Sequence, residues 1–157
     1  MDSQQKGQLT FLIKTIMAEK NKIVQLDQYL GNQRSEWTSK IRELAKAFKD
    51  IDRLNDAMVT IPSYRQIIVE QIAQLNIKIK EQERKLARVY KDSFIKYYEY
   101  DYKLTDKQKE SFLKADMSDE SMILSLLETQ MDFMRESVKT LDNMSWAVRN
   151  KLQLNGL

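Results

Sequence analysis

The chain has 157 residues, and its three glycines and single proline are too few for the frequent turns of a fold built from short strands. Charged residues make up 31% of the sequence and the net charge is +3, a composition that suits helices with one apolar stripe and a wide solvated face. Cysteine and histidine do not occur, which excludes disulfide bonds, thiolate nucleophiles and the usual side chain for proton transfer near neutral pH. We expect an all-α protein whose long helices carry coiled-coil-like seams and assemble into a helical homo-oligomer.

An N-terminal helical hairpin is predicted for residues 1–60. In its first helix, apolar side chains recur at alternating steps of three and four over residues 9–30, which is a heptad seam. Gly31-Asn32 then predicts a helix end, and Ser35 is a suitable cap for the next helix. The apolar side of this second helix comprises Trp37, Ile41, Leu44, Phe48, Ile51 and Met58, with Leu54 or Asn55 at the remaining position.

A long basic helix is predicted for residues 61–103, because Pro62 disfavours helical geometry in the residue before it and fits the first turn of a new helix. The preceding helix should therefore end near Val59. A continuous seam follows at Ile68, Ile72, Leu75, Ile79, Gln82, Leu86, Val89 and Ser93. At about 1.5 Å per residue this helix is on the order of 50 Å long, more than a chain of this size can cover, so we expect self-association.

A short helix and a C-terminal oligomerisation helix are predicted for residues 104–157. Thr105 and Gln108 have the spacing of a capping box, which favours a short helix over residues 107–114. Ser118 can cap the last helix. Gln82 and Gln130 are polar residues on apolar seams. They either fix the register of the helices or mark a locally wet seam, and both alternatives stay open.

Catalytic and metal-binding patterns are weak. Asp116, Asp119 and Glu120 lie near the expected start of the last helix, where acidic side chains favour the positive end of the helix dipole, so they do not predict a metal site. The sequence contains no glycine-rich phosphate-binding loop. We therefore expect no enzyme activity, no cofactor and no metal.

Positive charge is concentrated on the predicted basic helix, where residues 78–91 contain six cations and two acids. Four of the cations follow one another at steps of four, four and three on the side opposite the seam, and aromatic residues are dense from Tyr90 onward. Cations that track phosphates, beside aromatic faces on which bases stack, are typical of binding to single-stranded nucleic acid. The candidate DNA-binding residues are Lys80, Arg84, Lys85, Arg88, Lys91, Tyr97 and Tyr98.

Two plainer explanations of this pattern stay open. A run of charges on a long helix is commonly just a solvated face, and aromatic residues near a helix end commonly pack against a neighbour. In addition, the acidic last helix can pair with the basic helix and neutralise its cations.

The order of features from Tyr64 to Leu152 resembles the UvsY-type recombination mediators of T-even-like phages. The resemblance consists of a long basic helix with Lys85, Ala87 and Arg88, the pair Tyr97-Tyr98, the segment KESFLKAD, and a final helix reading LETQMDFM and then VKTLDNMSWAVRNKLQ. Proteins of that family bind single-stranded DNA, form closed rings and help a recombinase replace the single-strand-binding protein on DNA.

The resemblance implies that Ala87-Arg88 corresponds to a DNA-binding segment of the family and that the last helix corresponds to its ring-assembly region. The expected oligomerisation residues are Ile123, Leu127, Met131, Met134, Val138, Leu141, Trp146 and Val148.

Two functional hypotheses follow. The first is a non-enzymatic mediator that binds single-stranded DNA, meets a recombinase and a single-strand-binding protein, and forms a homo-oligomeric ring in the cytoplasm of a phage-infected bacterial cell. The second is a coiled-coil structural, scaffolding or adaptor protein that does not bind nucleic acid. We expect no membrane segment in either case, because no apolar run approaches the length that a membrane span needs.

Overall fold

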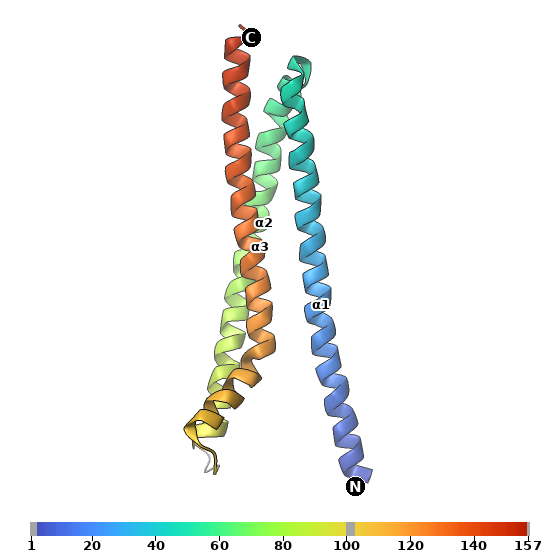
Figure 1. Cartoon of the computed structure of the whole chain (residues 1–157), viewed down its shortest axis with the longest axis vertical. Helices are drawn as coiled ribbons and strands as arrows, with labels where there is room; N and C mark the ends of the chain where they lie inside the picture. The colour runs from blue at the N-terminus through green and yellow to red at the C-terminus, as the bar shows by residue number, and fades with distance from the viewer. Residues whose placement is uncertain (1–2, 100–102, 157) are drawn as a thin grey trace. The chain divides into compact units, whose positions relative to one another are not determined.

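The computed structural model describes the backbone of residues 3–99 and 103–156, and the side chains of residues 17–99, except residue 19, and 103–156. Figure 1 shows its elements, which are α1 (Ser3–Lys46), the 3-10 turn η1 (Ala47–Lys49), α2 (Ile51–Phe94), the π-helical turn η2 (Ile95–Glu99) and α3 (Asp106–Leu154). The described residues form no strand, which confirms an all-α protein. In this part of the chain, no helix has both the length and the apolar character that crossing a membrane requires.

The chain divides into two compact units, each built from parts of all three helices. Unit 1 comprises Met1–Tyr29 and Lys80–Leu126, and unit 2 comprises Leu30–Ile79 and Leu127–Leu157. The cluster of buried apolar side chains lies entirely in unit 2.

The core of unit 2 brings one face of each helix together. Its most deeply buried side chains lie seven residues apart on two helices: Leu54, Ile61 and Ile68 on α2, and Met134, Leu141 and Val148 on α3. From α1, the ring of Trp37 meets Tyr64 edge to face at 5.6 Å, and its indole nitrogen donates a hydrogen bond of 2.9 Å to Gln71. Burying each large apolar side chain contributes about 1.5–3 kcal/mol, so this core is the main source of stability in unit 2.

The helix end predicted at Gly31-Asn32 is wrong, because α1 continues through it and Ser35 lies inside the helix. Leu30 and Trp37 are each 3% exposed and are seven residues apart, so one face of a continuous helix buries both. Burial of each contributes about 1.5–3 kcal/mol, which exceeds the cost of about 1 kcal/mol for a glycine in a helix. The chain reverses instead at η1 and at Asp50, which has an extended backbone.

The helix end predicted near Val59 is also wrong, because α2 runs through Pro62. Proline in a helix interior lacks an N–H donor and costs about 3 kcal/mol. Ile61 and Ile68 on either side are 1% and 0% exposed, and ending the helix would remove them from the same buried face. Packing therefore outweighs the local preference, while Pro62 itself faces solvent.

The apolar stripe expected at the start of α2 is wrong for Ile51 and Met58, whereas Leu54, one of the two alternatives for the position between them, is buried. Ile51 and Met58 are 45% and 46% exposed, whereas Leu54 and Ala57 are 0% and 2% exposed. The expected stripe assumed a helix that ran on from Trp37, but the turn at η1 resets the phase of the buried face.

Only the first of the two starts predicted after residue 104 is real, because α3 is one continuous helix through Ser118. The predicted capping box is confirmed. The backbone N–H of Gln108 donates to the hydroxyl of Thr105 at 3.3 Å, and the backbone N–H of Thr105 donates to the side-chain oxygen of Gln108 at 2.9 Å. Ser118 is exposed within the helix and caps nothing.

Two side-chain hydrogen bonds join α1 to α3 in unit 2. Gln130 is 1% exposed, donates a hydrogen bond of 2.8 Å to Gln33 and accepts one of 3.0 Å from Arg34. Gln82 is also buried, at 8% exposure, so the alternative of a locally wet seam is wrong for both glutamines. Sliding α1 past α3 would leave a buried amide unpaired, which favours this register.

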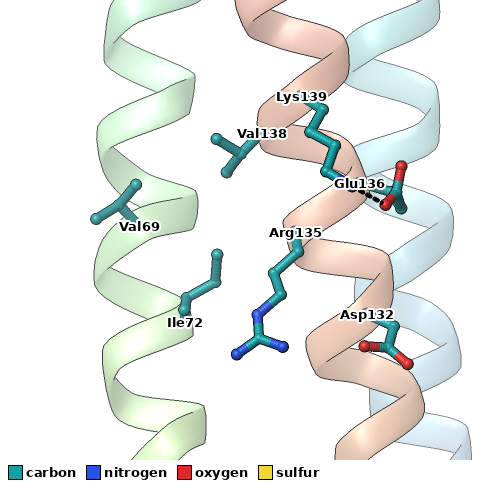
Figure 2. Close-up of a pocket in the computed structure, with 7 residues that line it drawn as sticks. All are labelled: Val69, Ile72, Asp132, Arg135, Glu136, Val138 and Lys139. Carbon is teal, nitrogen blue, oxygen red and sulfur yellow. Dashed lines mark hydrogen bonds and ion pairs between the residues drawn. The ribbon is translucent and has the colours of Figure 1, made fainter.

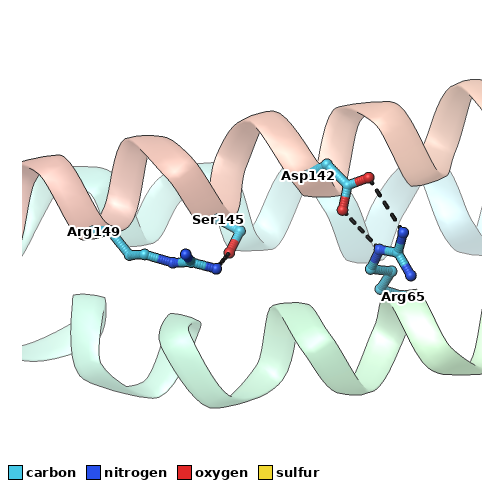
Figure 3. Close-up of polar contacts among 4 residues, drawn as sticks. All are labelled: Arg65, Asp142, Ser145 and Arg149. Atoms are coloured by element: carbon cyan, nitrogen blue, oxygen red, sulfur yellow. Dashed lines mark hydrogen bonds and ion pairs between the residues drawn. The ribbon is translucent and has the colours of Figure 1, made fainter.

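An ion pair joins α2 to α3 at the surface of unit 2, as Figure 3 shows. The Nε of Arg65 donates to Asp142 at 2.7 Å, and Arg149 donates to Ser145 at 3.3 Å nearby. The hydrogen bond with Asp142, followed by the charge of that carboxylate, raises the pKa of Arg65. The contribution of this ion pair to stability is fully present below the unfolded-state pKa of the guanidinium. It is lost only as pH rises through the folded-state pKa, far above neutrality.

Candidate nucleic-acid interface

The outer face of α2 in unit 1 presents five cations, which we call the basic stripe: Lys80, Arg84, Lys85, Arg88 and Lys91. Arg84, Arg88 and Lys91 are exposed and, within the described part of the chain, none of the three forms an ion pair. Lys80 pairs with Glu83 of the same helix at 2.8 Å, and both side chains remain largely exposed. A surface pair of this kind contributes little, so a phosphate can compete for Lys80 as well.

Lys85 is held differently from the rest of the stripe. Its ammonium group lies 2.8 Å from Glu120 of α3, whose side chain is only 12% exposed. The same carboxylate accepts a hydrogen bond of 2.5 Å from Gln82, which also donates to the backbone oxygen of Glu120 at 3.0 Å. Of the five predicted DNA-binding cations, all of which are described, Lys85 alone pairs with the acidic helix.

Beside the stripe, three aromatic rings stack along α2 and η2 at intervals of four residues. The rings of Tyr90 and Phe94 are 5.9 Å apart, and those of Phe94 and Tyr98 are 4.6 Å apart and nearly parallel, at 9°. The three residues are 45%, 39% and 37% exposed. We call Tyr90, Phe94 and Tyr98 the aromatic ladder. Large apolar rings left this exposed commonly mark a binding surface.

Tyr97 does not belong to this surface, contrary to the prediction. It is 8% exposed and its ring stacks on Phe112 of α3 at 5.7 Å. In this position it contributes to the packing of η2 on α3 in unit 1, and a base cannot reach its face. Adjacent residues of η2 therefore point in opposite directions, with Tyr98 outward and Tyr97 inward.

A further cation lies at the end of the ladder. The ammonium group of Lys109, from the first turn of α3, is 5.3 Å from the centre of the Tyr98 ring. It also lies 3.7 Å from Asp106. The position of Lys109 beside Tyr98 was not predicted, because no sequence pattern indicates that these two side chains meet. The four-residue spacing of the ladder, by contrast, is visible in the sequence.

Stripe and ladder occupy neighbouring sides of one helix. At 100° per residue, Phe94 lies between the direction of Tyr90 and that of Lys91, so the cations flank the rings along the helix. The stacked rings are too close together to admit a base between them, so bases would stack on the open face and the exposed edges of the ladder. The arrangement can hold phosphates on one side and bases on the other, as binding of a single strand requires.

The residues predicted for oligomerisation are mostly used inside the chain. Leu127, Met131, Met134, Leu141 and Val148 are 0–5% exposed within unit 2, and Ile123 and Val138 are half-buried. A side chain that fills the core of its own chain has no surface left for a second chain. Trp146 is the exception, because it is 69% exposed.

Among the described residues, no group of three or more acidic side chains is placed so that it could hold a metal ion. Comparison of the chain with family models, curated proteins and solved structures gave no match. The geometry of the outer face of α2 is therefore the main evidence on function.

Proposed function

We propose that the outer face of α2 in unit 1 binds single-stranded DNA and that the protein is a recombination mediator without enzyme activity. The observation that carries the DNA-binding part is the exposed aromatic ladder beside Arg84, Arg88 and Lys91, whose charges have no partner in the described part of the chain. Support for the mediator part is the resemblance of residues 64–152 to the UvsY-type family.

In this proposal the mechanism is positional. The cations bind phosphates and release the counterions condensed on the strand, while the ladder stacks on bases regardless of their sequence. A homo-oligomer repeats the site and multiplies its effective affinity. DNA held in this way is loosened from the single-strand-binding protein and presented to a recombinase.

The first experiment is a fluorescence-anisotropy titration of the full chain with a labelled oligo(dT) strand at low and at moderate salt. We expect Arg84→Glu/Arg88→Glu/Lys91→Glu to weaken binding by at least a hundredfold, because three phosphate contacts become repulsive. The matched control is Arg42→Glu/Lys46→Glu/Arg53→Glu, which changes the net charge equally at exposed positions of unit 2.

Equal losses in the two triple variants would show that binding follows net charge alone and would contradict a site on α2. No binding by the wild-type chain at low salt would contradict the proposal altogether. It would leave the coiled-coil scaffold or adaptor, whose basic stripe meets an acidic protein.

A second arm tests the ladder. Phe94→Ala removes the middle ring, and we expect about a tenfold loss of affinity for oligo(dT), since stacking on an aromatic side chain is worth about 1–3 kcal/mol per base. Binding to a duplex of the same length should change little, because its bases are already stacked. Tyr29→Ala is the matched control, because Tyr29 is 63% exposed on α1.

A further inference from the structure

Unit 2 has an open groove between α2 and α3. Its main part has a volume of about 730 Å³ and is lined on its floor by Val69, Ile72 and Val138. A second part of about 320 Å³ continues it past Ile79 and Met131. The rim carries charged residues of α3, and Figure 2 shows Arg135 reaching from α3 into the groove while Asp132 lies on the outer side of that helix.

Of the five charged residues of α3 that line the groove, four are sorted by sign along the helix, and the fifth, Glu136, pairs with Lys139. Glu128 and Asp132 come first and are four residues apart, and Arg135 and Lys139 come next and are also four residues apart. Glu128, Asp132 and Arg135 have no ion pair in the described part of the chain, although Asp132 and Arg135 are close enough in sequence to form one. Lys139 pairs only with its neighbour Glu136, at the surface, with both side chains 68% exposed.

This order is self-complementary. If a second α3 runs antiparallel to the first, with a two-fold axis crossing midway between Asp132 and Arg135, then Asp132 of each copy meets Arg135 of the other. Because the acids and the bases have the same spacing, the same register also brings Glu128 of each copy to Lys139 of the other. An interface of this two-fold kind requires one patch to complement itself.

We propose that a second copy of this chain packs on the α2–α3 groove of unit 2, antiparallel, with its α3 beside the first α3 and the floor residues Val69, Ile72 and Val138 covered. The charge order selects a second copy over an unrelated helix, because one antiparallel register pairs Glu128 and Asp132 of each copy with Lys139 and Arg135 of the other. Of the residues predicted for oligomerisation, Met131 and Val138 line this groove, whereas Met134, Leu141 and Val148 fill the core of the single chain. The groove is also independent of the proposed DNA site, which lies in unit 1.

The test is sedimentation velocity on the full chain across a wide range of concentration. Asp132→Arg and Arg135→Asp each place like charges opposite one another twice in a two-fold interface. We expect each to raise the dissociation constant by about tenfold or more. Mixing the two variants restores both pairs, since one copy then carries two bases and the other two acids, so the mixture should associate while each variant alone does not.

Glu70→Arg and Arg42→Asp serve as matched controls, because both residues are exposed and neither lines the groove. A wild-type chain that stays monomeric at every concentration overturns the proposal. So does an oligomer that neither single substitution weakens, or two weakened variants that fail to associate when mixed. Oligo(dT) binding by the monomeric variants reports separately on the DNA site, so the two proposals fail independently.

Discussion

At the residue scale, Glu120 is the acid that competes with phosphate for one cation of the basic stripe, Lys85. Its largely buried carboxylate holds Lys85 at 2.8 Å and Gln82 at 2.5 Å, so Lys85 can reach a phosphate only by leaving this partner. The other cations of the stripe face no such competition from α3 in the described part of the chain.

Replacing Glu120 with glutamine should release Lys85 while keeping an oxygen that can accept from Gln82. We predict that Glu120→Gln binds oligo(dT) about three- to tenfold more tightly and that its affinity falls more steeply with salt, by up to one additional phosphate contact. Asp116→Asn is the control. It makes the same change in charge, and the carboxylate of Asp116 accepts a hydrogen bond from Ser93. An equal gain in both variants would assign the effect to net charge instead of to Lys85.

For two residues of the predicted oligomerisation set, we expect substitution by alanine to have different effects on the free energy of unfolding. Leu141 is 0% exposed in the core of unit 2, and Leu141→Ala should lower the free energy of unfolding by about 2–5 kcal/mol. Trp146 is 69% exposed, and Trp146→Ala should change it by less than about 0.5 kcal/mol. Urea titration followed by circular dichroism measures both. A small effect at Leu141 would mean that this face of α3 is not packed inside one chain.

At the element scale, each of the three helices is longer than its local sequence signals suggest. Gly31 in α1 has room for a side chain, since an added Cβ would meet only the guanidinium of Arg34, at 3.7 Å. It does not have the positive φ of a helix-ending glycine, which in the described chain occurs only at Gly156.

We therefore predict that Gly31→Ala raises the free energy of unfolding by about 1 kcal/mol, because alanine costs less conformational entropy in a helix. If Gly31 ended the helix in a left-handed conformation, the same substitution would destabilise the protein, so the sign of the change decides. Thermal and urea unfolding of the two proteins, followed at the helix band of the circular dichroism spectrum, give that sign.

The helical class and the buried faces of the later helices were predictable from the sequence, because apolar spacing is a local property. The seam expected from Ile68 to Ser93 is buried or half-buried throughout, and the capping box at Thr105 is formed. The helix ends were not predictable, because packing overrides the local stop signals at Gly31 and Pro62 and the local start signal at Ser118. The seven-residue spacing from Leu30 to Trp37 was the signal for continuity, and it was present in the sequence.

The candidate site was predictable in part for the same reason. The outer position of Arg84, Arg88 and Lys91 follows from helical periodicity and is seen in the structure. The inward turn of Tyr97 depends on its stacking with Phe112, a contact between residues of different helices, which periodicity alone does not give.

At the scale of the whole molecule, the two units differ in what holds them together. The apolar cluster lies in unit 2, whereas the α2–α3 contacts of unit 1 include buried polar residues. Gln82 donates a hydrogen bond to Glu120, and Ser93 donates one of 2.9 Å to Asp116. Polar contacts of this kind contribute less net free energy than buried apolar side chains. Unit 1, which carries the candidate DNA site, should therefore open more readily than unit 2.

Native-state hydrogen exchange followed by mass spectrometry tests this difference. We predict that amides of residues 80–94 and 106–126 exchange at least tenfold faster than those of residues 54–72 and 130–150, because they open by local unfolding at a lower free energy. Oligo(dT) should slow the exchange of residues 80–94 selectively. Equal protection along all of α2 and α3 in the free protein would contradict a weaker unit 1.

The most direct test of the central claim is the salt dependence of oligo(dT) affinity for the wild-type chain and for Arg84→Glu/Arg88→Glu/Lys91→Glu. Each neutralised phosphate of a single strand contributes about 0.7 to the slope of log affinity against log salt. We predict that the variant loses about 2 units of slope together with at least a hundredfold in affinity at low salt. A variant with the slope and the affinity of the wild type would show that the outer face of α2 does not hold the strand.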